Sequence, residues 1–445
     1  MSNILSETYI KLLNNIILPI GDKAFGGDYI KHLKEWNQFD LKSSDELAEI
    51  QRARLSEILT HAHETVPFYK NKIDKSFTDP YQTLKKLPVL SKTLLTEKRE
   101  ELVSDQFSED ELSKNFSSGS TGVQSYSYSL PKDVFLNQAI QRHWFLWTGY
   151  RQGDPVMQFG ISPQRTLVKK LKDIFFNATY VNAFSISEED CKQLYLKLKK
   201  KKIQFMIGYP SAIYQLAKWM KENDKKHQIK SIISLGDKLF SHYEKLFQDV
   251  FNKPLVMDTY GCAEGFLIAA RLDHPYYYIS SPHVVVEIVD DEGNEVKDGE
   301  MGHVLLTSLT NYAQPFLRYK LGDLAVRLPK NEYPESPQFN YPLLKKIVGR
   351  ETDAIHTPTN ISLTVHSFTG IFEYYEEIVQ FKVIQTTKEN LLIEYISEEQ
   401  IDLIIKEIKK KLDKLTQNSM KIDFERVEKI SAMKSGKPQI IEKRI

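Results

Sequence analysis

The stretch IKSIISLGDKLFSHYEKLFQDVFNKPLVMDTYG, residues 229–261, decides the fold. It reads as a short apolar strand, a helix over about 239–250 and a second short strand. Similar apolar runs stand upstream, PVMQFGI at 155–161 and KIQFMIGY at 202–209, with helix-like segments between the runs. Short apolar strands that alternate with helices are typical of βα units on a mostly parallel sheet. We therefore predict an α/β fold for the core of the chain.

Downstream of this core the pattern changes to antiparallel strands. Residues 284–296, VVVEIVDDEGNEV, read as a strand pair that turns at Asp291–Asn294, which predicts a β-rich subdomain. A proline-rich loop follows at 328–343, and the remaining residues alternate strands and helices as a small α+β unit does. We predict a large N-terminal domain at 1–352, with mixed, mostly parallel sheets, and a small mobile C-terminal domain at 353–445.

Composition narrows the function classes. The 445 residues carry 60 Lys and Arg against 59 Asp and Glu, a net charge of +1, so no overall field attracts nucleic acid. Small substrates are expected instead. The only two cysteines, Cys191 and Cys262, lie far apart, which indicates neither a disulfide framework nor a thiolate zinc site. A reducing, cytoplasmic location is expected.

The amino terminus does not read as a targeting segment. It has no basic region followed by a signal-peptidase site, and no window of the chain is apolar enough to span a bilayer. Residues 4–20 can form an amphipathic helix, which we expect to pack on the body or on a second subunit rather than on a membrane. The expected partners are therefore small molecules, with a homodimer possible.

The segment SSGSTG, Ser117–Gly122, is the most informative motif. Two glycines let backbone N–H groups turn inward and four hydroxyls add donors, which together can cradle polyphosphate oxygens. A Walker loop would have a lysine after the second glycine, where this chain has Val123 and Gln124. Alone, such a stretch is more often a flexible loop, so its meaning depends on the motifs that accompany it.

Further motifs follow in a fixed order, and their residue types suit a nucleotide. Tyr260 could stack on a base, Glu264 could hold Mg²⁺, and Asp323 could accept sugar hydroxyls. The motifs are DTYGCAEG at 258–265, RYKLGD at 318–323, GRETD at 349–353 and SGK at 435–437.

Taken together, these motifs resemble those of the adenylate-forming acyl-CoA ligase superfamily. The flanking segments TVPFYKNKI, KKLPVLSK and LTSLTNYAQPFLRYKLGD are similar to its phenylacetate-CoA ligase branch, which includes the CapK-like proteins. The resemblance runs from about residue 50 to the end. It implies an ATP site made of Ser117, Ser118, Gly119, Ser120, Thr121, Gly122, Gly236, Asp237, Tyr260, Gly261, Asp323 and Arg350.

The resemblance also implies catalytic roles. Lys437 matches the lysine that bridges the substrate carboxylate and the α-phosphate, and Thr121 and Glu264 would act with it. Glu264 would be the Mg²⁺ ligand, and Asp353 occupies the hinge position about which the C-terminal domain would rotate. An ammonium placed between two reacting anions strengthens its contacts as the transition state forms.

The implied activity is that of an ATP-dependent, AMP-forming acid–thiol ligase. A small carboxylic acid, first an aromatic one, would become an acyl-adenylate with release of pyrophosphate, and coenzyme A would then take the acyl group. Two alternatives remain open: transfer to an amine of an amino acid or amino sugar, and a catalytically silent scaffold.

The chain departs from the family pattern at three places. Val123-Gln124 replaces the usual lysine and proline after the phosphate loop. Pro358-Thr359-Asn360 lacks the usual glycine after the hinge, and this second departure makes the coenzyme A step less secure than adenylation. The surroundings of Cys262 offer no zinc ligand set, so no zinc is expected.

Overall fold

The structure is a computed structural model of the 445-residue chain. It describes residues 2–24, 26–117, 125–160, 166–183, 186–262, 264–350, 355–359, 362–363, 365–372, 375, 377–397, 399–430 and 440–445.

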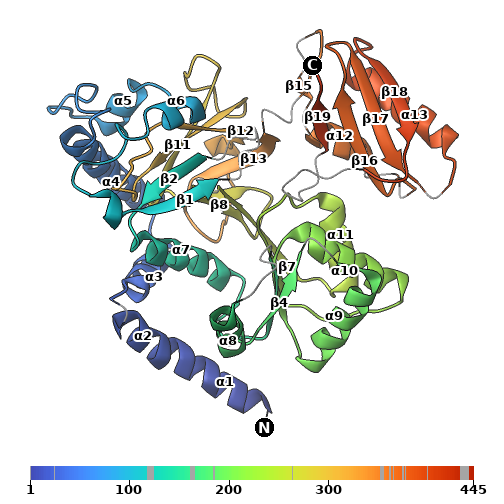
Figure 1. The fold of residues 1–445 in the computed structure, drawn as a ribbon, viewed down its shortest axis with the longest axis horizontal. Helices are drawn as coiled ribbons and strands as arrows, with labels where there is room; N and C mark the ends of the chain where they lie inside the picture. Colours follow the sequence, from blue (N-terminus) through green and yellow to red (C-terminus); the bar gives the residue numbers. More distant parts are fainter. Residues whose placement is uncertain are drawn as a thin grey trace. The chain divides into compact units, whose positions relative to one another are not determined.

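The chain divides into two compact units (Figure 1). The first comprises residues 1–286, 306–319 and 330–344, and the second comprises residues 287–305, 320–329 and 345–445. The predicted domain boundary at residue 353 falls outside the described residues and stays a prediction.

The first unit opens with helices and a hairpin. The elements are α1 (Ser2–Leu12), the π-helical η1 (Leu13–Ile17), α2 (Leu18–Ala24), α3 (Tyr29–Phe39), α4 (Ser44–Thr65), α5 (Pro80–Lys85), α6 (Lys92–Glu97), η2 (Glu109–Glu111), β1 (Ser113–Ser117), β2 (Ser125–Ser129) and α7 (Asp133–Trp147). Helix α4 begins with a capping box in which the side chain of Ser43 accepts from the Glu46 N–H, and it ends at Thr65, just before Pro67.

Five parallel strands form the centre of the first unit. The βα elements are β3 (Val156–Gly160), α8 (Leu167–Phe175), β4 (Ala178–Asn182), α9 (Glu188–Lys200), β5 (Phe205–Gly208), α10 (Pro210–Glu222), β6 (Ser231–Ser234), α11 (Ser241–Val250) and β7 (Leu255–Gly261). The pairs β4–β3, β3–β5, β5–β6 and β6–β7 are all parallel. The predicted α/β fold is confirmed.

One helical layer covers these strands. Helices α9, α10 and α11 lie together beside β4 and β7 (Figure 1). Their apolar faces, with Leu198, Leu216 and Phe247, form one core cluster with Met206 and Ile232 of the strands, and all five side chains are fully buried. Burial of aliphatic and aromatic side chains contributes about 1.5–3 kcal/mol for each one, so this layer fixes the βα frame.

The sheet continues after β7 with β8 (Leu267–Arg271), β9 (Tyr277–Ile279), β10 (Val284–Val289), β11 (Met301–Ser308), β12 (Tyr319–Arg327) and β13 (Leu343–Arg350), and η3 (Lys330–Glu332) lies in the proline-rich loop. The pairs β7–β8, β8–β9 and β13–β9 are antiparallel. The full order in this sheet is β10-β11-β12-β13-β9-β8-β7-β6-β5-β3-β4. The predicted turn after β10 is present, because the Asp290 N–H bonds to the Asn294 carbonyl at 2.9 Å.

The C-terminal part of the second unit is a small α+β fold. Its elements are β14 (Ile355–His356), β15 (Ser362–Leu363), α12 (Val365–Phe372), β16 (Gln380–Gln385), β17 (Asn390–Ile396), α13 (Asp402–Leu415), β18 (Lys421–Arg426) and β19 (Ile441–Lys443). Four strands pair in the order β18-β17-β16-β19. Phe368 of α12 and Ile408 of α13 share their core with Ile393 of β17. Within the described ranges, no helix of the chain has the length and apolarity needed to cross a bilayer.

A buried histidine in the first unit predicts acid sensitivity. His283 lies between Trp36 of α3 and Phe266, and burial lowers its pKa to about 3. The unfolded chain protonates this imidazole below about pH 6.5 while the folded chain does not, so the free energy of unfolding falls as the pH drops from 6.5 toward 3, by up to about 1.4 kcal/mol per pH unit. In urea unfolding, we expect the free energy of unfolding of His283→Gln to fall by about 2 kcal/mol less than that of the wild type between pH 7 and pH 5. An identical slope in both proteins would contradict this assignment.

Candidate functional site

The predicted phosphate loop connects the two strands of a hairpin. β1 and β2 pair antiparallel with Ser117 opposite Ser125, so the backbone at the two ends of the loop is held together. Ser118, Gly119, Ser120, Thr121 and Gly122 lie outside the described residues.

Buried amides anchor this hairpin in the first unit. The Tyr128 N–H of β2 donates to Oε1 of Gln314 at 2.8 Å, and Nδ2 of Asn311 donates to the Tyr128 carbonyl at 3.0 Å. Both amides are buried, at 1% and 7% exposure. The segment 311–319 therefore fixes the hairpin that carries the loop.

The parallel register brings further motifs to one edge of the sheet. Gly208 of β5, Ser234 of β6 and Asp258 of β7 stand opposite one another. Gly236 follows β6, which ends at Ser234, and Tyr260 lies two residues after Asp258 on β7, so both come after this row at the carboxyl ends of the strands. The carboxyl ends of parallel strands are where open α/β sheets bind ligands.

The Gly236-Asp237 turn is packed against the end of the neighbouring strand. Gly236 has φ +92°, and a Cβ there would lie 2.7 Å from Cζ of Tyr209. The Ser211 hydroxyl donates to Oδ2 of Asp237. Burial, and then the charge of Asp237, raises the pKa of Tyr209. Tyr209 and Ser211, which follow β5, thus belong to the same site as the turn.

The YGCAEG motif spans the end of β7 and the turn that leads to β8, and its Ala263 lies outside the described residues. Tyr260 is buried, at 9% exposure, and Gly261 ends β7. The Cys262 N–H donates to the Phe266 carbonyl at 3.0 Å, and the Gly265 N–H donates to the Cys262 carbonyl at 3.1 Å. Burial, and then the charge of Glu264, raises the pKa of the Cys262 thiol well above its usual value. A thiol that stays protonated is a poor nucleophile.

Glu264 is held by a residue of another motif. The Tyr319 hydroxyl donates to Oε1 of Glu264 at 3.1 Å. Phe316 packs between the two segments, with its ring 5.2 Å from Phe266 and 5.1 Å from Tyr319. Tyr319 was not singled out by sequence reasoning, although it stands inside the RYKLGD motif.

The chemistry of Glu264 suits a magnesium ion. Its carboxylate is half-buried and offers hard oxygen ligands. Mg²⁺ is usually held by one or two carboxylates together with substrate phosphates and water, so a single glutamate is a fitting protein ligand. Within the described ranges, no group of three or more His, Cys, Asp or Glu side chains could hold a metal ion.

Sequence reasoning did not single out two further residues, Asp258 and Arg318, that tie neighbouring segments together. Asp258 is buried, its carboxylate accepts from Ser234 at 2.9 Å and from Tyr277 at 2.6 Å, and burial raises its pKa. Arg318 has φ +53°, and its guanidinium donates to the carbonyls of Lys85 and Leu87 at 3.0 Å. Nothing in the sequence indicates that the arginine of RYKLGD ties distant backbone together.

The other predicted site residues belong to the second unit. Asp323 lies half-buried on β12, and Arg350 ends β13. Asp353 and Lys437 lie outside the described residues.

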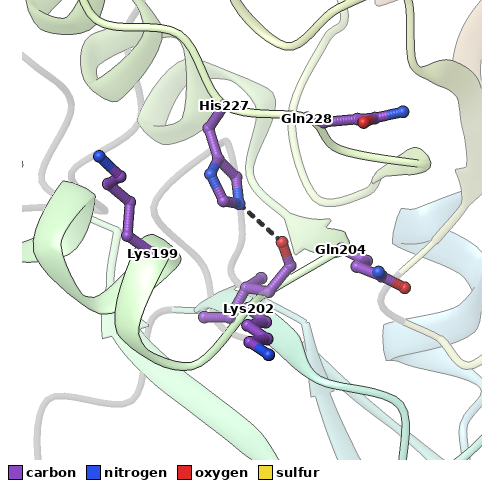
Figure 2. A pocket seen from close by; sticks show the side chains of 6 residues that line it. Lys199, Lys202, Gln204, His227 and Gln228 are labelled. Carbon is purple, nitrogen blue, oxygen red and sulfur yellow. Dashed lines mark hydrogen bonds between the residues drawn. The ribbon is translucent and has the colours of Figure 1, made fainter. Parts of the chain in front are cut away.

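A shallow pocket lies at the amino ends of the parallel strands, away from the candidate site. Figure 2 shows its lysine, glutamine and histidine side chains, and its volume is about 220 Å³. Nε2 of His227 contacts the Ile203 carbonyl at 2.9 Å. The lining residues are Lys199, Lys202, Ile203, Gln204, His227 and Gln228. Gln204 precedes β5, so this pocket is at the amino ends of the strands and takes no part in the candidate site.

Two glycines with nearly equal positive φ angles allow a matched test of the Gly236-Asp237 turn. Gly299 has φ +91°, but a Cβ there would be 3.5 Å from Cγ of Pro329, an ordinary contact. We expect Gly299→Ala to cost about 1 kcal/mol from backbone strain alone. Gly236→Ala should cost roughly 1–3 kcal/mol more, because the Tyr209 ring must move. Equal losses in urea unfolding would show that Tyr209 does not constrain the turn.

Known proteins share sequence with this chain. Residues 179–312 match the family model of the AMP-binding enzymes. Protein CapK of Staphylococcus aureus is 23% identical over 96% of both chains. Indoleacetate–lysine synthetase of Pseudomonas savastanoi is 29% identical over 135 residues, which are 29% of this chain and 31% of that one.

A solved structure shares the fold over most of its length. A 2-hydroxyisobutyryl-CoA ligase, solved in the postadenylation state, has a TM-score of 0.71 at 17% identity and covers 91% of both chains. The family-model match, the full-length similarity to CapK and the shared fold agree with one another. Residues 179–312 thus match the AMP-binding enzymes, and the chain has the fold of the adenylate-forming ligases.

Proposed function

We propose that this chain activates a small carboxylic acid as an acyl-adenylate, with ATP as the co-substrate and pyrophosphate as the leaving group. The observation that carries the proposal is that the Gly236-Asp237 turn and Tyr260 both follow the paired row of β6 and β7 at the carboxyl ends of these strands, and that Tyr319 holds Glu264. Free Cys191 and Cys262 agree with a cytoplasmic location.

The roles follow the chemistry of each group. Tyr260 stacks on adenine beside the Gly236-Asp237 turn, and the loop 117–122 wraps the β- and γ-phosphates with N–H and O–H donors. Asp323 accepts the ribose hydroxyls, and Arg350 supports the ribose or the phosphate. Magnesium at Glu264 would neutralise charge on the phosphates.

The reaction joins two anions, which sets the demand on Lys437. A carboxylate oxygen of the acid attacks the α-phosphorus, the bond from that phosphorus to the bridging oxygen breaks, and pyrophosphate leaves. Like charges repel along this path, so a cation that contacts both the carboxylate and the α-phosphate is worth more in the transition state than in the ground state. We assign that role to Lys437, with Thr121 at the phosphates and Asp353 as the hinge.

Coenzyme A is the first candidate for the acyl acceptor. The motif order resembles that of acyl-CoA ligases, and the fold is similar to that of a 2-hydroxyisobutyryl-CoA ligase. In this step the thiol sulfur attacks the acyl carbon, the bond to the AMP oxygen breaks, and a thioester forms.

An amine is the second candidate. Indoleacetate–lysine synthetase, named for joining an aromatic acid to an amino acid, is similar over 135 residues of this chain. The missing glycine in Pro358-Thr359-Asn360 also weakens the docking expected for the thiol step. In this version the amine nitrogen attacks the acyl carbon and an amide forms.

Pyrophosphate release from ATP, measured over a panel of aryl, fatty and amino acids, tests the proposal. Each acid is assayed alone, with coenzyme A and with a mixture of amino acids and amino sugars. We expect release that requires an acid, with an aryl acid the best substrate. A thioester product would establish coenzyme A as the acceptor, an amide would establish an amine, and silence with every acid would favour a scaffold.

Lys437→Ala should abolish adenylation. The loss of the bridging ammonium is expected to lower pyrophosphate release by roughly a thousandfold or more, with the unfolding temperature unchanged. Lys443→Ala, an exposed lysine of β19, is the matched control and should keep full activity. Near wild-type release by Lys437→Ala would remove this lysine from the mechanism.

Glu264→Gln should weaken the magnesium dependence. An amide is a poorer ligand for a hard cation than a carboxylate, so half-maximal activity should need roughly tenfold more Mg²⁺. Tyr319→Phe keeps the carboxylate and removes only its hydrogen-bond donor, so it should shift the titration much less. An unchanged Mg²⁺ titration in Glu264→Gln would take Glu264 out of the metal site.

A further inference from the structure

Helix α8 turns its apolar face away from the protein. Thr166 caps the helix, accepting from the Lys169 N–H at 3.3 Å. At about 100° per residue, its apolar side chains fall within one arc of about 120°. Those on this arc are Leu167, Val168, Leu171, Ile174 and Phe175. The first four are 66–78% exposed and Phe175 is 38% exposed, whereas Asp173 on the opposite side is half-buried.

The N-terminal helix extends this apolar surface. The Tyr9 ring meets the Phe175 ring edge-on, with centroids 6.5 Å apart, and the Tyr9 hydroxyl donates to the Phe175 carbonyl. Leu12, three residues after Tyr9, shares its face of α1 and is 43% exposed. Figure 1 shows α1 and α8 side by side. Tyr9 contacts the Phe175 end of the arc, while Leu167, Val168, Leu171 and Ile174 stay largely exposed.

Lysines border the apolar arc. Lys170 lies next to Ile174 on one border, Lys172 lies next to Val168 on the other, and Lys169 is on the far side. All three are exposed, and Asp173 is the only acidic residue of the helix. Long lysine side chains can lie along an apolar surface while their ammonium groups reach anionic groups at its rim.

We propose that α8, with the exposed side of α1, docks on an anionic lipid surface. An exposed apolar arc flanked by cations is the pattern of a helix that lies in the plane of a membrane interface. Charge argues against a second copy as the occupant, because a two-fold interface would bring the lysine borders of the two helices together. One short helix with two bordering lysines supplies weak, reversible and salt-sensitive attachment. This inference does not depend on the proposed adenylation.

Flotation of the full-length protein with vesicles tests the docking. The protein is mixed with phosphatidylcholine vesicles or with phosphatidylcholine–phosphatidylserine vesicles at low and high salt. We expect flotation with the anionic vesicles at low salt only. Leu171→Glu/Ile174→Glu should lower it by roughly tenfold or more, because two charges would enter the interface.

Matched controls separate this surface from general stickiness. Leu41→Glu/Leu403→Glu makes the same change at side chains that are 76% and 81% exposed elsewhere, and it should float like the wild type. Lys170→Gln/Lys172→Gln should lose roughly tenfold in binding to anionic vesicles, whereas Lys199→Gln/Lys200→Gln, on exposed lysines at the end of α9, should not.

Three results would overturn the proposal. They are absence of flotation with anionic vesicles, equal flotation with neutral vesicles, and a dimer in light scattering that Leu171→Glu/Ile174→Glu splits. The last would mean that a second copy covers α8. Pyrophosphate release by these variants should stay unchanged, so failure of the docking and failure of the adenylation proposal are distinguishable.

Discussion

The parallel register of β5, β6 and β7 is the constraint on which the candidate site depends. Pairing of Gly208 with Ser234, and of Ser234 with Asp258, aligns the ends of β5 and β6 with Asp258 of β7. A shift of one residue would turn the buried faces of these strands away from the α9–α11 layer. The same core packing that stabilises the sheet therefore sets the separation of the Gly236-Asp237 turn from Tyr260.

Hydrogen bonds between the motifs then position Glu264 and the hairpin of the phosphate loop. The Tyr319 hydroxyl reaches Glu264, and Gln314 and Asn311 hold the hairpin of the phosphate loop, so one segment, 311–319, supports both. Because the amides are buried, loss of either partner would leave an unpaired polar group, which costs about 1–3 kcal/mol. A segment placed in this way can keep the loop and the glutamate in register while substrates exchange.

Sequence reasoning predicted the βα order and the turn after β10, because local periodicity and turn residues carry those signals. It also placed Tyr260 and Glu264 in one motif, which the structure has at the end of β7 and in the turn after it. It missed the contacts that join distant segments, such as Arg318 to the carbonyls of Lys85 and Leu87 and Ser234 and Tyr277 to Asp258. These contacts depend on tertiary placement, which no local pattern encodes. The roles of Thr121, Asp353 and Lys437 rest on the motifs alone.

Oxygen transfer tests the central claim, formation of an acyl-adenylate, most directly. The best acid of the panel is labelled in its carboxylate with heavy oxygen, and the AMP formed is examined by mass spectrometry. Attack of the carboxylate on the α-phosphorus, followed by transfer of the acyl group, leaves one labelled oxygen on AMP. Unlabelled AMP, or label found in inorganic phosphate together with ADP, would contradict adenylation of the acid.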